Sequence, residues 1–225
     1  MHRHFEKGHK KLNSMFEDLC NTVENNFTQL TLAMEKMDVS YFDKFPDLDL
    51  SIDEKEIAIE EECLKLLALY QPVAGDLRSI IAILKVNGEI ERIGDLTSNI
   101  AYRAKSLHSF KMEASAFLIP EICTIVRKML HNSLKSFMNR DRNMAIKVCH
   151  LDEQVDDLHG DMYKVLRVDF EKNPKKYDAY MSYISMSRFL ERIGDHTTNI
   201  AEDLLYLMEG EIFRHRKIEV YRPTD

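Results

Sequence analysis

The sequence repeats an eleven-residue segment after one hundred positions. Residues 91–101 read ERIGDLTSNIA and residues 191–201 read ERIGDHTTNIA, so nine of the eleven positions are identical. A repeat of this kind is typical of a supersecondary unit that has been duplicated and packs against its copy. The 225 residues leave room for two units of about 100 residues each. We therefore expect two similar halves, residues 1–112 and 113–225.

Apolar residues recur at helical spacing through almost the whole chain, and no segment alternates as a strand would. This pattern predicts an all-α protein built from two three-helix bundles, six helices in total. The predicted helices cover residues 5–37, 51–70, 74–105, 121–139, 142–171 and 176–208. Residues 41–48, which contain Pro46, are expected to form an irregular connection. A bend is expected near Gly160, a stop at Gly210, and a polar tail over 214–225.

Composition excludes several classes of function. The formal net charge of −7 argues against nucleic acid as a partner, because phosphate backbones bind concentrated Lys and Arg. No apolar stretch reaches the length of a signal peptide or a membrane span. We therefore expect a cytoplasmic protein that meets a membrane only through partners. The four cysteines show no CxxC spacing and are expected to be reduced and buried: Cys20, Cys63, Cys123 and Cys149.

Carboxylates form a row on each repeated helix. Glu91, Asp95 and Asn99 follow one another at intervals of four residues and therefore line one helix face, opposite the apolar residues that enter the core. The second copy repeats this row, and the list is Glu191, Asp195 and Asn199, extended by Glu202. A second acidic spacing, D-x-x-x-D, precedes each row, as Asp49 with Asp53 and as Asp152 with Asp156. If the helices are neighbours, four carboxylates converge in each half.

Such rows are unfavourable in isolation. Like charges four residues apart destabilise a helix by a few tenths of a kcal/mol per pair, and a mid-helix glycine such as Gly94 or Gly194 costs roughly 0.5–1 kcal/mol. Bound divalent or trivalent cations would cancel the repulsion and give a reason for keeping the rows. The glycines would then allow another helix or a ligand to approach the row. In the alternative interpretation, Arg92 and Arg192 pair with the acids and the rows are structural.

Other chemistries find little support. The sequence has no HExxH motif, no glycine-rich phosphate loop, no nucleophile elbow and no inward Glu-x-x-His motif of the ferritin-like type. His196 follows Asp195 directly, and we interpret it as a surface histidine rather than a ligand. We therefore do not expect an enzyme. A multinuclear oxidase or phosphatase is the rival interpretation, which a turnover assay would test.

The motifs together resemble the PhoU family of bacterial phosphate-signalling proteins over nearly the full length of the chain. The resemblance rests on residues 71–78 (QPVAGDLR), on ERIGD at 91–95, and on ERIGDH at 191–196 with NIAE at 199–202. It implies two three-helix bundles related by a pseudo-twofold axis. The DLR segment has no counterpart in the second half, which reads NPKKYDAY at 173–180, and residues 36–48 are more irregular than the family pattern.

The resemblance also implies multinuclear metal clusters at the acid rows, of iron, zinc, manganese or magnesium. The first site would use Asp49, Asp53, Glu91 and Asp95 with Asn99 nearby; the second would use Asp152, Asp156, Glu191 and Asp195 with Asn199 and Glu202 nearby. The implied role is negative regulation of phosphate uptake, as an adaptor between a phosphate ABC transporter ATPase and a sensor histidine kinase. Alternatives are an accessory of a low-affinity phosphate permease and a metal-free helical interaction module. A homodimer and a monomer both stay open.

Overall fold

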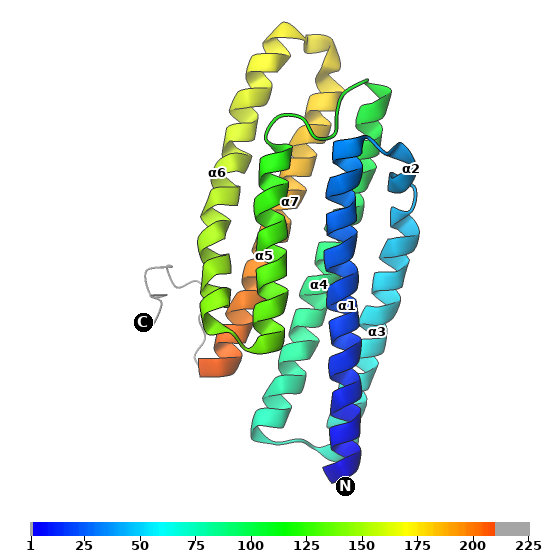
Figure 1. Ribbon diagram of the computed structural model, residues 1–225, viewed down its shortest axis with the longest axis vertical. Coiled ribbons are helices and arrows are strands. Elements are labelled where there is room, and N and C mark those ends of the chain that lie inside the picture. The colour runs from blue at the N-terminus through cyan, green and yellow to red at the C-terminus, as the bar shows by residue number, and fades with distance from the viewer. Residues whose placement is uncertain (1, 210–225) are drawn as a thin grey trace.

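The computed structural model describes residues 2–209, and these residues form helices joined by short connections (Figure 1). The long helices are α1 (His2–Lys36), α3 (Phe45–Tyr70), α4 (Ala74–Ser109), α5 (Ile119–Asn139), α6 (Arg142–Lys172) and α7 (Tyr177–Glu209). Two short pieces, α2 (Val39–Phe42) and a 3-10 turn (Pro174–Lys176), complete the described part. The predicted all-α fold of six helices is confirmed. The predicted stop at Gly210 and the tail at 214–225 lie outside the described residues.

The two halves are arranged as a pseudo-symmetric pair. Helices α1, α3 and α4 form one bundle, α5, α6 and α7 form the other, and the halves meet chiefly where α4 packs along α7. The α3–α4 and α6–α7 connections lie at opposite ends of the molecule (Figure 1). Residues 110–118 link the halves. Because α4 and α7 carry the repeated motifs, the contact between the halves brings the two copies into one central layer.

The apolar stripes of the repeated helices are buried, as the sequence predicts. Ile93 and Ile100 in α4 are fully buried, and so are Ile193 and Ile200 in α7. The matching polar positions therefore point away from this core. The four cysteines are all buried and free, in agreement with the sequence. Among residues 2–209, no helix combines the length and the apolar character that crossing a bilayer requires.

The prediction of an irregular connection over residues 41–48 is wrong. Helix α2 occupies Val39–Phe42, and α3 already begins at Phe45, with Pro46 in its first turn. Proline is well accepted there because the first amide groups of a helix have no intrahelical partner. Phe42 and Phe45 are both buried, so apolar packing draws this segment onto the bundle. Helix α6 also continues without interruption through Gly160, the position near which a bend is expected.

Ion pairs join α1 to α3 within the first bundle. The Lys11 ammonium donates to the Glu62 carboxylate at 2.7 Å, and Glu62 is buried. Lys55 of α3 donates to Asp18 of α1, also at 2.7 Å. These pairs fix α1 and α3 at one height, which in turn fixes the height of the acidic residues on α3 relative to α4.

Candidate metal centres

The first acid row forms a compact cluster with its neighbour on α3. One carboxylate oxygen from each of Asp53, Glu91 and Asp95 lies within 4.8 Å of the other two, and all three residues are half-buried. Glu91 and Asp95 come from consecutive turns of α4, and Asp53 comes from the facing turn of α3. The structure therefore brings together three of the four carboxylates predicted for the first site at a spacing that suits one cation.

Asp49 lies one turn before Asp53 and is held by the other helix. The Ser98 hydroxyl of α4 donates a hydrogen bond to its carboxylate at 3.0 Å. Partial burial raises the pKa of the Asp49 carboxyl above its ordinary value, and the negative charges of Asp95 and Asp53 raise it further. Burial and the charge of Asp95 likewise raise the pKa of Glu91. Burial and mutual repulsion thus both disfavour the charged forms of Asp49 and Glu91.

The two glycines of the repeat make the close helix packing possible. A Cβ atom on Gly94 would lie 2.8 Å from Cδ1 of Ile52 on α3, closer than side chains approach. A Cβ atom on Gly194 would lie 3.2 Å from the Asp152 carboxylate on α6. Glycine therefore lets α3 approach α4, and lets Asp152 approach the second acid row. This agrees with the role expected for both glycines.

The second site would draw on Asp152 and Asp156 of α6 and on Glu191 and Asp195 of α7, but among the described residues its carboxylates do not form a three-oxygen group as close as that of the first site. Burial, followed by the charges of Asp156 and Asp195, raises the pKa of Asp152 to about 7, while the Thr198 hydroxyl lowers it. Burial and the charges of Asp195 and Asp156 also raise the pKa of Glu191. The four predicted carboxylates of the second site therefore act on one another electrostatically.

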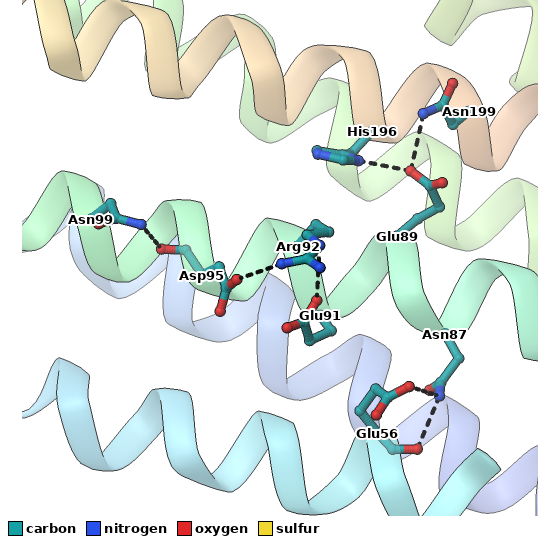
Figure 2. A network of polar contacts seen from close by, with 9 residues as sticks. All are labelled: Glu56, Asn87, Glu89, Glu91, Arg92, Asp95, Asn99, His196 and Asn199. Carbon is teal, nitrogen blue, oxygen red and sulfur yellow. Dashed lines mark hydrogen bonds and ion pairs between the residues drawn. The ribbon is translucent and has the colours of Figure 1, made fainter.

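Arg92 bears on the structural alternative. Its guanidinium lies 3.2 Å from the Asp95 carboxylate and 3.4 Å from the Glu91 carboxylate, as Figure 2 shows. Arg192, its counterpart in α7, forms no ion pair among the described residues of the chain. The first row is therefore partly neutralised by ion pairs, whereas the charge of Arg192 acts on Glu191 and Asp195 without such a pair.

The asparagines of the two rows have different partners. The Asn99 amide donates to the backbone carbonyl of Asp95 at 2.8 Å and stays beside the first site. The Asn199 amide instead donates to the Glu89 carboxylate of α4 at 3.0 Å, in the contact between the halves (Figure 2). Glu202 is half-buried, and its charge acts on Cys149, which Asp152 also influences. Glu202 thus lies at the end of the second site.

The interpretation of His196 as a surface histidine is wrong. Its side chain is only 17% exposed, and its Nδ1 lies 2.7 Å from the Glu89 carboxylate across the contact between the halves. Figure 2 shows both His196 and Asn199 directed at this one carboxylate. Sequence reasoning missed Glu89, because its counterpart in the repeat is Phe189 and no acidic pattern marks it.

Two further residues adjoin the sites at equivalent positions. The Glu56 carboxylate accepts a hydrogen bond from the Asn87 amide at 2.9 Å (Figure 2). In the second half, His159 occupies the position of Glu56, and its Nδ1 lies 2.8 Å from the hydroxyl of Ser187. Both follow the D-x-x-x-D spacing by three residues. Alignment of the two spacings would have pointed to this third position.

The donor set fits hard cations. Carboxylate oxygens are the ligands that magnesium, manganese and calcium prefer, and iron and zinc also accept them. The spacing of Asp53, Glu91 and Asp95 fits a single ion, and the adjacent Asp49 offers a fourth carboxylate. Burial and neighbouring carboxylates raise the pKa values of Asp49, Glu91 and Asp152, and a bound cation would offset the repulsion among these carboxylates.

Comparison with known proteins decides the family. The family model for the PhoU domain matches twice, at residues 16–104 and 119–204. The chain belongs to the PhoU family. It is 35% identical over 201 residues to the Aquifex aeolicus "Phosphate-specific transport system accessory protein PhoU homolog", covering 89% of this chain and 91% of that protein. It is 31% identical to the Edwardsiella tarda PhoU accessory protein, covering 86% of this chain and 79% of the relative.

Solved PhoU structures share the fold. The chain superposes on PhoU from Pseudomonas aeruginosa with a TM-score of 0.87 at 31% identity, covering 92% of this chain and 100% of the other. For the phosphate transport system regulatory protein PhoU from Streptococcus pneumoniae, the TM-score is 0.81 at 26% identity, with coverage of 92% and 98%. The names of PhoU relatives describe accessory and regulatory proteins, in agreement with the expectation that this chain is not an enzyme.

Proposed function

We propose that this protein regulates phosphate uptake and phosphate-starvation signalling in the cytoplasm, as a metal-binding adaptor between a phosphate ABC transporter ATPase and a sensor histidine kinase. Membership of the PhoU family and the names of its relatives support the link to phosphate transport. The observation that carries the metal-binding part is the close grouping of Asp53, Glu91 and Asp95; around Asp152 the support is the electrostatic coupling of the carboxylates.

The adaptor role follows from how the charges are displayed. The acid rows lie on the non-core faces of α4 and α7, where a partner can reach them. A cation bound there converts a repelling negative surface into one that accepts carboxylates or phosphates of a partner. Binding of the partner and of the metal are then linked, because each contributes to the same coordination shell.

The decisive experiment measures metal content by elemental analysis of untagged protein purified without chelators. The wild type is expected to carry at least one metal ion per chain, and the double variant Asp95→Asn/Asp195→Asn is expected to carry almost none. Asp47→Asn/Asp178→Asn, which neutralises two exposed acids outside the rows, is the matched control and should keep the metal. Equal metal contents in wild type and Asp95→Asn/Asp195→Asn would refute the metal sites.

Partner binding is tested with the same variants. Purified transporter ATPase and the cytoplasmic part of the sensor kinase are immobilised in turn, and the affinity of each variant is measured. We expect the Asp95→Asn/Asp195→Asn variant to lose at least tenfold in affinity for one or both partners. If the variant lacks metal yet binds both partners as the wild type does, the adaptor surface lies elsewhere.

A second candidate is the metal-free helical interaction module. The ion pairs of Arg92 with Asp95 and Glu91 favour it for the first row, because they partly neutralise that row without a cation. It predicts that neither row holds metal and that a basic partner surface binds the acids directly. A third, the accessory of a low-affinity phosphate permease, differs only in the partner, and the permease in place of the ATPase tests it.

A further inference from the structure

A cavity of about 380 Å³ lies between the two halves, at the end of the bundle where α5 ends. Its walls come from all sides: His9 from α1, Ser79 from α4, Arg140 after the end of α5, and Leu207 from α7. This volume is in the range of natural sites for small organic ligands, about 300–1,000 Å³. None of the carboxylates of the acid rows lines it, so the cavity is separate from the candidate metal centres.

Two positively charged side chains without an ion pair among the described residues line the cavity. Lys135 and Arg140 both line it, and neither forms an ion pair within the part of the chain that the structure describes. Among its described lining, Glu17 is the single carboxylate. The Nε2 atom of His9 lies 3.5 Å from the Ser79 hydroxyl, which places two further polar groups at the wall. In a protein of net charge −7, two cations against one carboxylate give this cavity a local excess of positive charge.

One wall of the same cavity is apolar. The rings of Phe16 and Phe137 lie with their centroids 5.3 Å apart, and Ile83 and Leu207 complete this side. The combination of an apolar wall with a few convergent polar groups is what small-molecule sites share. An anion without an organic part would leave the aromatic side unused. The wall therefore favours an anion attached to an organic group.

The pseudo-symmetric end of the molecule shows what the fold itself requires. Helices α1 and α5 end at residues 36 and 139, and the residue that follows each, Met37 and Arg140, has a left-handed backbone with φ of 52° and 54°. Residues 103 positions apart are thus equivalent in these helices, and residues 100 apart are equivalent in α4 and α7. Met37 takes the place of Arg140, and Tyr183 takes the place of Ile83.

At that equivalent end the corresponding space is packed. Tyr183 is fully buried, its ring contacts Phe117 edge-on at 4.9 Å, and its hydroxyl donates to the backbone carbonyl of Glu113. The sulfur of Met37 accepts a hydrogen bond from the Ala114 amide at 3.2 Å. At this end, the side chains of Tyr183, Phe117 and Met37 therefore fill the space that corresponds to the cavity. Within residues 2–209, the end that carries Arg140 therefore differs from the equivalent end in the residues that fill it.

We propose that this cavity binds a phosphorylated organic molecule of nucleotide size. The phosphate meets Arg140, whose guanidinium fork matches phosphate oxygens, and Lys135, which adds a point charge. The organic part packs against Phe16 and Phe137. Because the lining residues come from both halves, the ligand bridges the halves at this end. The site stands independently of the proposed metal centres.

The test is isothermal titration of the full chain with AMP, inorganic phosphate and adenosine, all in a chelating buffer so that the acid rows hold no metal. We expect AMP to bind at least tenfold more tightly than inorganic phosphate, and adenosine to bind more weakly than AMP. Lys135→Gln/Arg140→Gln should weaken AMP binding at least tenfold, which is about 1.4 kcal/mol. Lys128→Gln, an exposed lysine of α5 outside the cavity, is the matched control and should bind AMP normally.

Methyl NMR of the methionines locates the ligand. Met138 lines the cavity, and its methyl signal should shift on addition of AMP, whereas the signal of Met37 at the packed end should not. Circular dichroism confirms that the double glutamine variant is folded.

The proposal is overturned if AMP gives neither heat nor a Met138 shift, if the double variant binds AMP as the wild type does, or if inorganic phosphate binds as tightly as AMP. Asp95→Asn/Asp195→Asn should bind AMP unchanged, so failure of the metal sites and failure of this site are told apart.

Discussion

The Glu89 carboxylate of α4 lies 2.7 Å from Nδ1 of His196 on α7. The same oxygen accepts the Asn199 amide, so one carboxylate of the first half holds two side chains of the second. A neighbouring ion pair, Lys85 with Asp203 at 2.6 Å, also crosses from α4 to α7. Polar contacts thus fix the register of the two motif helices, beside the apolar packing that joins them.

Removal of this carboxylate is expected to loosen the contact between the halves. Glu89→Ala leaves His196 and Asn199 without their acceptor. We therefore expect the free energy of unfolding to fall by about 1–3 kcal/mol. For a chain of this size, each kcal/mol lowers the melting temperature by about 2–4 °C. Thermal unfolding followed by circular dichroism measures the change. Glu54→Ala, which removes an exposed carboxylate of α3, should change the melting temperature by much less; equal losses would show that Glu89 is not a clamp.

Arg92 is expected to compete with a cation for the first row. Arg92→Ala frees Glu91 and Asp95 and should tighten cation binding at this site several-fold, as measured by titration of the chelated protein with Mn²⁺. Arg192 forms no equivalent ion pair among the described residues, so Arg192→Ala should alter Mn²⁺ affinity less. If both variants bind Mn²⁺ as the wild type does, Arg92 does not compete with the cation for the Glu91 and Asp95 carboxylates.

Asp152 makes the metal-free protein sensitive to pH. Its folded pKa of about 7 lies above the ordinary value of 3.8, so the folded state binds the proton more tightly than the unfolded state. Stability therefore falls as pH rises from about 4 through 7. In chelating buffer, we expect a higher melting temperature at pH 5 than at pH 8, and Asp152→Asn should flatten the difference by at least about 2 °C. A slope that is unchanged in Asp152→Asn would assign the effect to other groups.

The glycines of the helices are expected to respond differently to alanine. A Cβ on Gly160 meets no atom within 4 Å, so Gly160→Ala should stabilise the protein by about 0.5–1 kcal/mol through helix propensity alone. Gly194→Ala gains the same propensity but crowds the Asp152 carboxylate, and should therefore weaken metal binding. Gly94→Ala forces Ile52 to move and should be neutral or destabilising by about 1 kcal/mol. Chemical denaturation and metal titration of the three variants check this order.

Periodicity was sufficient to predict the six helices and the acid rows, because the motif is repeated and the apolar residues keep a helical spacing. It failed at residues 41–48, because Pro46 interrupts the apolar period although it lies in the first turn of α3. It also failed at His196 and Asn199, whose partner Glu89 is close only in three dimensions. Contacts between the halves depend on the relative height of α4 and α7, and a spacing within one helix does not contain that information.

The internal duplication has a consequence for stoichiometry. In an ancestral homodimer of identical three-helix subunits, symmetry would have given both ends of the bundle the same residues. In a single chain the two ends can differ, and Met37 and Arg140 stand at equivalent places. The acid rows are paired, one on α4 and one on α7, whereas at the described end that is equivalent to the cationic cavity Tyr183 is fully buried. A dimeric ancestor would have carried two such cavities or none.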